Sequence, residues 1–298
     1  MALTINTNIS SMIVQSNLSK ATTSLNQAIE RMTTGYKINH ASDNAAGYSI
    51  ATNWETQLGS LDVAADNAAT GADMMTTLED TYSLVSTHLQ RVRDLTEQAA
   101  NGTYGSASLK AIQSEITARL EEVDRIAANC EFNGLHLMNG TIKNDINLQV
   151  GLYSQASSQI ALDQSLFEKA DVGTLFKAAG GGASIEEVAK ACSGYDESQP
   201  VGQRITGKQN EMLDKIDKVI NEISARTTTL GSAQNRIESA IESIGVQSEN
   251  ITSSLSTLRD ADVAEESSKY IKAQILQQAS ATLLATANQT PSIALNLL

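Results

Sequence analysis

The chain has 298 residues, of which 41% are hydrophobic but only 4% aromatic, with two prolines and one tryptophan. Such a composition favours long, uninterrupted helices with shallow packing over a thick globular core. A formal net charge of −13 argues against nucleic acid and anionic membrane as main partners. No stretch approaches the apolar run of about 18 residues that a membrane-spanning helix needs.

The N-terminal arm is amphipathic but thinly apolar. Over residues 3–32 it carries Leu18, Leu25 and Met32, with Ala21 and Ala28 between them. It has no basic segment followed by a continuous apolar one, so it is not a Sec-type signal peptide. Taken alone, these features predict a soluble, cytosolic protein.

The next segment predicts a long helix that packs along its side against another helix. One apolar column repeats every seven residues, and a partner column slips by one position halfway, which would alter the winding of a supercoil. Asn101-Gly102 supplies turn chemistry that ends this helix. The first column is Trp54, Leu61, Ala68, Met75, Tyr82 and Leu89, and the second is Leu58, Ala65 and Ala72, then Leu78, Val85 and Val92.

A third helix and a β-hairpin are predicted to follow. Apolar residues spaced by three and four from Leu109 to Cys130 predict an amphipathic helix, at whose end Cys130 is expected to be buried. Asn-Gly pairs at 133–134 and 139–140 predict turns. Strict alternation over 146–152, followed by two apolar residues in 160–162, is the one clear strand signal and predicts a hairpin.

Residues 171–202 are expected to be a short, variable surface segment. Three glycines at 180–182 and a polar cluster before Pro200 predict loops, with one short helix at 184–192. The glycines lack the Gly-Lys-Ser/Thr ending of a phosphate-binding loop. Two cysteines are too few for a disulfide framework, and the exposure of Cys192 stays open.

The C-terminal third contains the strongest pattern in the chain. A seam of two columns sustained over six heptads predicts one helix over 207–259, about 80 Å long and suited to contact along its side. The first column is Ile216, Ile223, Leu230, Ile237, Ile244, Ile251 and Leu258, and the second includes Leu213, Ile220, Ile241 and Leu255.

The C-terminal arm, residues 263–290, is as thinly apolar as the N-terminal arm. Burial of so narrow a strip does not offset the backbone entropy lost when roughly thirty residues become ordered. Both arms are therefore expected to be disordered in the free chain and to fold when packed with further surface, for which other copies of the chain are the obvious source.

Long motifs at both ends resemble a known family. The runs ALTINTNISSMIVQSNL and ERMTTGYKINHASDNAAGYSIA, with the tail RDADVAEESSKYIKAQILQQASATLLATANQTPSIALNLL, are similar to the terminal signatures of bacterial flagellin. LQRVRDLTEQAANGT and IQSEITARLEEVDRIAANCEFNGLHLMNG resemble its outer-helix region. The likeness covers residues 1–165 and 203–298.

The resemblance implies a structural subunit, not an enzyme, that polymerises into the extracellular flagellar filament for motility. It also implies export by the flagellar type III system without cleavage, which replaces the cytosolic expectation. The implied partners are other copies of the chain, an export chaperone, and hook-associated and cap proteins. No cofactor or metal is expected. Identical subunits that join head-to-tail through non-self-complementary surfaces form open helical assemblies.

The expected fold is mainly α: a long antiparallel helical bundle or coiled coil with one small β-hairpin region, whose terminal helices pair in a filament core. Large outer domains should be absent, because only residues 171–202 are available for them. The expected divisions are an inner core half and spoke at 1–43, an outer-core domain at 44–170, the variable segment at 171–202, the returning helix at 203–254, and the second inner core half at 255–298.

Polymerisation contacts are assigned to six apolar residues of the two arms. The alternative is that these side chains form an intramolecular core, which the thinness of the arms disfavours. The six residues are Leu18, Leu25, Met32, Leu276, Leu283 and Leu284.

The resemblance also implies recognition of the monomer by a Toll-like receptor of the innate immune system. Gln90, Arg91, Leu95 and Glu115 match the receptor-contacting region of the family. Arg91 and Glu115 would be exposed anchors around a small apolar contact. The alternative is a solvated helix face that packs between protofilaments.

Three other functions stay open. A hook-associated junction protein would share the terminal motifs, and an intracellular coiled-coil scaffold would share the heptads. A catalytic function has little support, because His40, His88 and His136 are scattered and no zinc-binding H-E-x-x-H motif is present. A nucleophile-base pair of Cys130 and His136 is disfavoured by the expected burial of the thiol.

Overall fold

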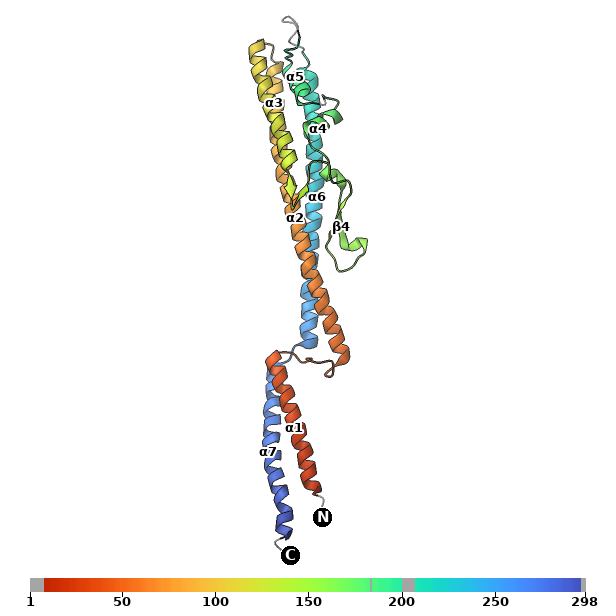
Figure 1. The fold of residues 1–298 in the computed structure, drawn as a ribbon, viewed down its shortest axis with the longest axis vertical. Helices are drawn as coiled ribbons and strands as arrows, with labels where there is room; N and C mark the ends of the chain where they lie inside the picture. Colours follow the sequence, from red (N-terminus) through yellow and green to blue (C-terminus); the bar gives the residue numbers. More distant parts are fainter. Residues whose placement is uncertain (1–7, 183, 200–206, 296–298) are drawn as a thin grey trace. The chain divides into compact units, whose positions relative to one another are not determined.

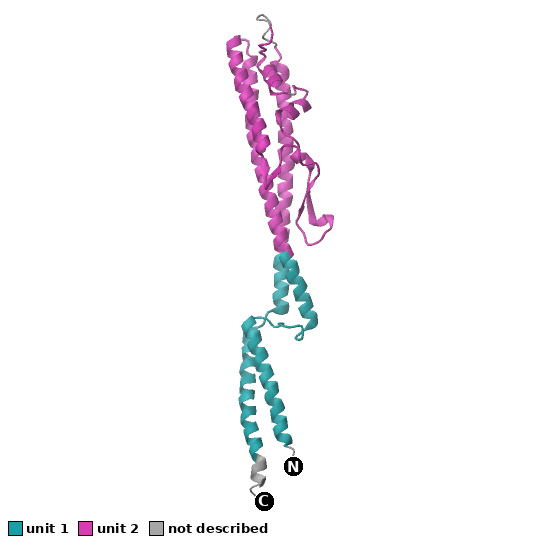
Figure 2. Ribbon diagram, in the orientation of Figure 1, with its two compact units in different colours: residues 1–59, 247–298 teal, residues 60–246 magenta. Residues whose placement is uncertain are grey.

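The computed structural model describes residues 8–182, 184–199 and 207–295. It divides into two compact units, residues 1–59 with 247–298 (unit 1) and residues 60–246 (unit 2), which Figure 2 colours separately. The helices α2 (Ala45–Ala100) and α6 (Gln209–Arg259) each contribute residues to both units. The boundaries between the two units fall within these two helices, and the expected divisions after residues 43 and 254 stay a prediction. No helix in the described ranges has the length and apolarity to cross a bilayer.

Unit 1 is built on two helices, α1 (Ile9–Thr34) and α7 (Val263–Leu295). The side chain of Asn8 caps α1 by accepting a hydrogen bond from the Ser11 N–H at 3.0 Å. Gly35 ends the helix at φ 75°, a left-handed conformation that favours glycine, and its N–H donates to the Arg31 carbonyl at 2.9 Å.

The two helices lie side by side and antiparallel (Figure 1). At one end the Asn8 side chain donates to the Ala287 carbonyl at 2.8 Å, and at the other Arg31 lies 3.5 Å from Glu266. The seam between them is lined by small side chains rather than by leucines. Its buried residues include Ala21, Ala28, Ala273 and Ser280.

In the structure both arms are helical and paired with each other, and their disorder in the free chain in solution stays a prediction. The sequence argument treated each arm as a separate strip. It omitted the pairing of the arms, whose small residues allow close backbone approach, and polar links such as Gln277 Nε2 to Thr22 Oγ1 at 3.2 Å.

Unit 2 is a helical bundle of α2, α6 and α3 (Ser106–Asn129). All three predicted helices are present. α2 ends just before the predicted Asn101-Gly102 turn, and α6 begins at Gln209 rather than at residue 207. Both predicted columns are buried along α2 from Met75 to Val92, which confirms the slip between them. The core of α6 is the predicted column, buried from Ile216 to Ile244.

Two small antiparallel hairpins follow α3. The predicted one is formed by β3 (Ile146–Gln149) and β4 (Gln159–Leu162), with Ile146 opposite Leu162. The sequence did not predict a second hairpin of β1 (Glu131–Phe132) and β2 (Leu135–His136). Its turn is the Asn-Gly pair at 133–134, with φ 49° and 81°, as a tight turn between paired strands requires. Two single turns complete this region, η1 (Ala156–Ser158) and η2 (Gln164–Phe167).

The expectation of a surface segment at 171–202 is wrong for its described part, which contributes to the core of unit 2. It forms α4 (Val172–Ala178) and α5 (Ile185–Ser193), the second close to the predicted short helix. Glycines and polar residues separate the two helices and conceal their apolar faces in the sequence. The buried hydrophobic residues of the segment are Val172, Leu175, Phe176, Val188, Ala189, Cys192 and Tyr195.

Candidate assembly interface

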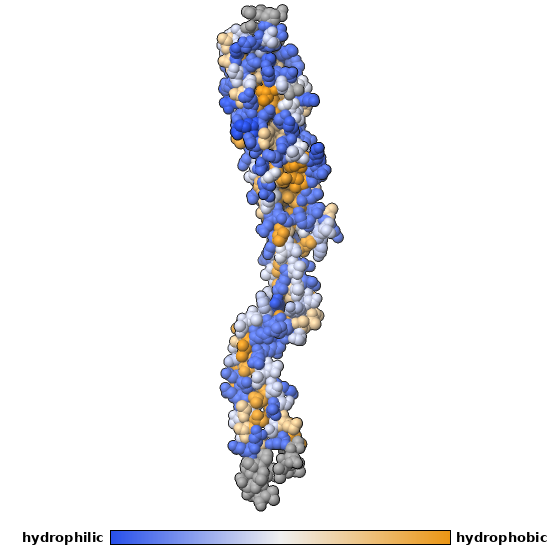
Figure 3. All heavy atoms as spheres, in the orientation of Figure 1, coloured by the Kyte–Doolittle hydropathy of each residue, from blue (hydrophilic) through white to orange (hydrophobic). Residues whose placement is uncertain are grey.

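Large apolar side chains of unit 1 lie outside its own seam. Ile9 and Met12 are each 62% exposed, and Ile275 is 60% exposed. Figure 3 shows hydrophobic surface over the α1 and α7 pair. The seam between α1 and α7 is lined by small residues, and bulky apolar residues face the solvent. In an ordinary helical hairpin the bulky apolar residues line the seam. The other exposed members of this set on α1 and α7 are Ile13, Ile29, Met32, Val263, Ile271, Leu276 and Leu283.

The six predicted polymerisation residues divide into two groups. Met32, Leu276 and Leu283 are exposed, at 37%, 49% and 57%, and are therefore free to contact another molecule. Leu18, Leu25 and Leu284 are half-buried along the seam, where they also support the pairing of α1 with α7. The alternative of an intramolecular core therefore applies in part to Leu18, Leu25 and Leu284. It does not apply to the exposed Met32, Leu276 and Leu283.

A groove of about 650 Å³ runs between the two helices on one side of the seam. Its α7 wall carries the apolar Leu276, Ala279 and Leu283 beside the charged Glu266, Lys269 and Lys272. Its α1 wall is polar, with Asn17, Lys20, Ser24, Gln27 and Arg31.

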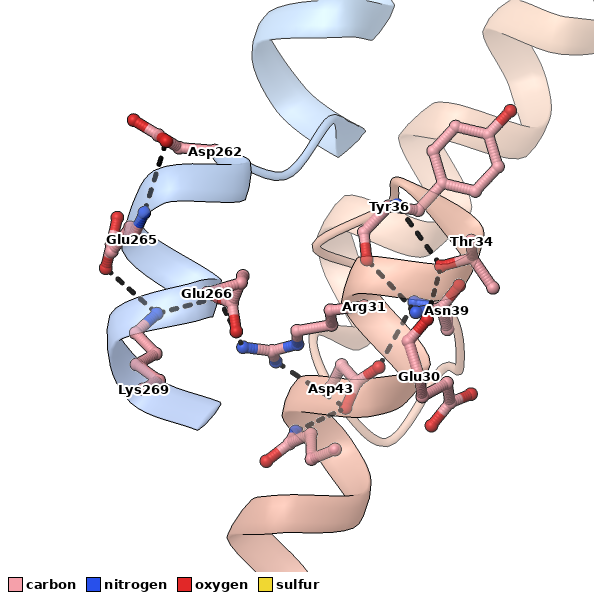
Figure 4. Close-up of polar contacts among 11 residues, drawn as sticks. Glu30, Arg31, Thr34, Tyr36, Asn39, Asp43, Asp262, Glu265, Glu266 and Lys269 are labelled. Atoms are coloured by element: carbon pink, nitrogen blue, oxygen red, sulfur yellow. Dashed lines mark hydrogen bonds and ion pairs between the residues drawn. The ribbon is translucent and has the colours of Figure 1, made fainter. Parts of the chain in front are cut away.

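One end of the groove is a polar junction of Arg31, Asp43, Glu266 and Lys269, shown in Figure 4. Arg31 lies 3.5 Å from Glu266 of α7 and 3.9 Å from Asp43 in the segment after α1. Glu266 is only 4% exposed, and Lys269 contacts it from the next turn at 2.8 Å. A buried carboxylate without partners would be costly, so the two cations make the burial of Glu266 tolerable.

Asp43 organises the segment that connects α1 to α2. It accepts hydrogen bonds from the backbone N–H groups of Asn39 and His40, each at 3.1 Å, and from the Gln27 side chain at 3.1 Å. Donation from the His40 N–H is the main cause that holds the pKa of Asp43 below its ordinary value, helped by Asn39, Gln27 and the Arg31 charge.

Backbone pairing joins this segment to the one that connects α6 to α7. The Lys37 N–H donates to the Arg259 carbonyl at 2.6 Å, and the Ala261 N–H donates to the Gly35 carbonyl at 2.8 Å. The Arg259 guanidinium lies 4.2 Å from the ring centroid of Tyr36 and pairs with Glu55. These contacts fix the two crossing connections of unit 1 together.

The predicted receptor surface lies on α2 and α3 in unit 2. Arg91 Nη2 pairs with Glu115 Oε1 at 2.9 Å, with side chains 48% and 39% exposed, and Gln90 is exposed beside them. Leu95 differs from the expectation. It is only 2% exposed and packs in the bundle core, so it offers no accessible apolar contact in the monomer.

Both thiols are buried. Burial raises the pKa of Cys192 to about 12 and also raises that of Cys130, whose Sγ lies 3.4 Å from Thr81 Oγ1. In the described residues no group of three or more His, Cys, Asp or Glu side chains could hold a metal ion. The open question on Cys192 is thus answered in favour of burial.

Sequence reasoning missed the polar junction. Arg31, Asp43 and Glu266 are ordinary charged residues on thin amphipathic arms, and no local spacing connects position 31 with position 266. The available signal was a glutamate in register with Ala273 and Ser280, at seven-residue intervals on the small face of α7.

The comparisons with known proteins agree with one another. Residues 5–143 match the profile of the bacterial flagellin N-terminal helical region, and residues 213–298 match that of its C-terminal helical region. The chain is 34% identical to flagellin of Xenorhabdus nematophila, over 100% of both chains, and 33% identical to flagellin of Bacillus subtilis, over 99% of both. A Vibrio parahaemolyticus structure described as a flagellar hook-associated protein shares the fold, with a TM-score of 0.59 at 13% identity over 73% of this chain and 100% of that one.

Proposed function

The chain belongs to the bacterial flagellins, structural proteins rather than enzymes that form the flagellar filament, and we propose that the outward apolar faces of α1 and α7 make its filament contacts. The observation that carries this proposal is the exposure of Met32, Leu276 and Leu283 beside a seam of alanines. Apolar surface of this extent on a soluble chain favours association. The helices present it along their sides, as an open helical assembly requires.

Point variants on α7 test the proposal. Burial of one leucine side chain contributes about 1.5–3 kcal/mol, so Leu276→Gln or Leu283→Gln is expected to raise the critical concentration for polymerisation by about tenfold or more. Because both side chains are exposed, helicity and the unfolding midpoint of the monomer should change little. Gln278→Ala, an exposed polar position on the same helix, is the matched control. Polymerisation of both leucine variants at the wild-type concentration would contradict the proposal.

We further propose that the chain is exported through the flagellar type III system without cleavage and acts outside the cell. This rests on family membership. Its implied partners are an export chaperone and the hook-associated and cap proteins. Intact-mass measurement of secreted protein, in cells with and without a functional export apparatus, tests it. Detection of the chain only in the cytoplasm would instead favour the intracellular scaffold.

A second candidate function is recognition of the monomer by a Toll-like receptor. It is favoured by the exposed Arg91–Glu115 pair, which presents a cation and an anion side by side next to Gln90. Arg91→Ala is expected to reduce receptor signalling, and Arg119→Ala, on the same surface but 3.9 Å from Glu115, is the comparison variant. Because Leu95 is buried, Leu95→Ala is expected to act through bundle stability. Unchanged signalling by Arg91→Ala would remove this residue from the site.

The hook-associated alternative is distinguished by the product of assembly. This alternative is supported by the fold that the chain shares with a hook-associated protein. Because flagellins have the same fold, the fold alone does not separate the two functions. Electron microscopy of purified monomer after addition of sulfate, which strengthens apolar burial, should show long uniform filaments. Short caps or rings would favour the junction protein.

A further inference from the structure

The charges in the α1 and α7 groove are not balanced within the chain. Arg31 and Lys269 both neutralise the buried Glu266. Lys20 on α1 and Lys272 on α7 line the same groove, are exposed, and make no ion pair within 4.0 Å of any side chain that the structure describes. Two cations without an ion pair therefore lie beside the apolar side chains of the groove, in a chain that carries 34 acidic and only 21 basic residues.

We infer that this groove receives a helix from a second copy of the chain and that Lys20 and Lys272 pair with carboxylates of that helix. The inference rests on the proposed filament contacts and adds the chemistry of the incoming segment, which must be both apolar and acidic. Charge complementarity supports a second copy as the occupant, because the excess of 34 acidic over 21 basic residues makes carboxylates abundant on this chain.

The shape of the groove supports the same occupant. Its α1 wall extends from Asn17 to Arg31, which at about 1.5 Å per residue is roughly 20 Å, the length of about four helical turns. The groove presents apolar side chains, such as Leu276 and Leu283, beside charged ones, such as Lys20 and Lys272, which suits an amphipathic helix that carries carboxylates. Burial of an unpaired ammonium group would oppose assembly, whereas a carboxylate from the incoming helix removes that cost.

Zero-length cross-linking with a carbodiimide tests the pairing directly. Filaments are assembled from an equal mixture of unlabelled and nitrogen-15-labelled chains, cross-linked, digested and measured by mass spectrometry. We expect amide cross-links that join Lys20 or Lys272 of one isotope to an Asp or Glu of the other, present in filaments and absent from monomers. Cross-links at these lysines that join only chains of one isotope, or none at all, would overturn the inference.

Charge reversal provides the second measurement. Lys20→Glu and Lys272→Glu are expected to raise the critical concentration by about tenfold or more at low ionic strength, and the difference should narrow in 1 M salt. Lys143→Glu, an exposed lysine of a unit 2 loop, makes the same change in net charge and is the matched control. An equal effect of the control, or wild-type assembly of both groove variants, would overturn the pairing.

The two proposals fail in different ways. If Leu276→Gln impairs assembly but the groove lysines can be reversed without effect, the apolar contacts stand and the carboxylate pairing falls. If Leu276→Gln and Leu283→Gln are silent, the apolar contacts fall. Circular dichroism of each monomer separates both results from misfolding, and Lys20→Gln with Lys272→Gln, which remove the charge without reversing it, should give intermediate critical concentrations.

Discussion

Gly71 of α2 and Leu148 of β3 are packed so closely that a Cβ atom on the glycine would overlap a methyl group of the leucine. The β3–β4 hairpin is therefore seated on α2 at a position where the helix has no side chain. Asn67 Nδ2 adds a hydrogen bond to the Gln149 carbonyl at 3.2 Å, one turn away.

Gly71→Ala is expected to loosen the hairpin. Alanine gains about 1 kcal/mol of helix propensity, but the overpacking costs about 1–3 kcal/mol, so a small net loss in the free energy of unfolding is expected. Amide exchange of β3 and β4 should accelerate. Gly231→Ala on α6, where a Cβ meets no atom within 4 Å, should stabilise instead. Equal stabilisation by both variants, measured by urea unfolding, would show that the close packing of Gly71 against Leu148 does not restrict the residue at position 71.

Asp43 is expected to make unit 1 sensitive to acid. The pKa of its carboxyl is lower in the folded chain than the ordinary value of about 3.9. Its contribution to stability is therefore present above about pH 4 and is lost as the pH falls through the lower, folded pKa. Asp43→Asn should remove this part of the pH dependence and weaken amide protection at Asn39 and His40 near neutral pH. Asp66→Asn, exposed on α2, should leave both unchanged.

Both thiols are expected to be unreactive in the folded protein. With the pKa of Cys192 raised to about 12, almost none of it is thiolate at pH 8, and both side chains are buried. A colorimetric disulfide reagent should titrate no thiol in native monomer and two after unfolding in guanidinium. Disulfide-linked dimers in non-reducing electrophoresis of native filaments would contradict this prediction.

Gln209 is expected to stabilise the end of unit 2 where α2, α5 and α6 meet. Its buried side-chain amide lies 3.3 Å from the Ser193 carbonyl and 3.5 Å from the Ala99 carbonyl. Gln209→Ala leaves both acceptors without this donor and should cost about 1–3 kcal/mol of unfolding free energy. Asn210→Ala, the next and exposed position, should cost much less. Similar losses at both positions would show that the buried amide contributes nothing specific.

The long helices and their seams could be predicted because heptad spacing reports burial directly. Ile216 and Ile237 are fully buried, as their column requires. Val172, Phe176 and Cys192 were missed, because short apolar faces between glycines have too few repeats to show a period. The β1–β2 hairpin was missed for the same reason, since two-residue strands cannot alternate visibly.

The candidate interface could be predicted only in part. The thin apolar arms indicated that further surface is needed, and Leu276 and Leu283 were named from that argument. The pairing of Arg31 with Glu266 could not be predicted, because it joins residues far apart in the chain that no repeat relates. The burial of Leu95 was readable in principle, since it lies three residues after Val92 of the buried column.

In unit 1 the residues that stabilise the single chain are different from those proposed to contact other copies. Ala21, Ala28 and Ala273 are buried, so larger side chains there are expected to disturb the fold of the single chain. Ile9, Ile275 and Leu283 are exposed, so substitutions there are expected to leave that fold nearly unchanged. A mutational screen that scores heat resistance of the monomer would therefore pass nearly every change on the outward face as harmless. If the proposed filament contacts are correct, swimming cells would reject the same changes, which a test of the isolated subunit would not detect.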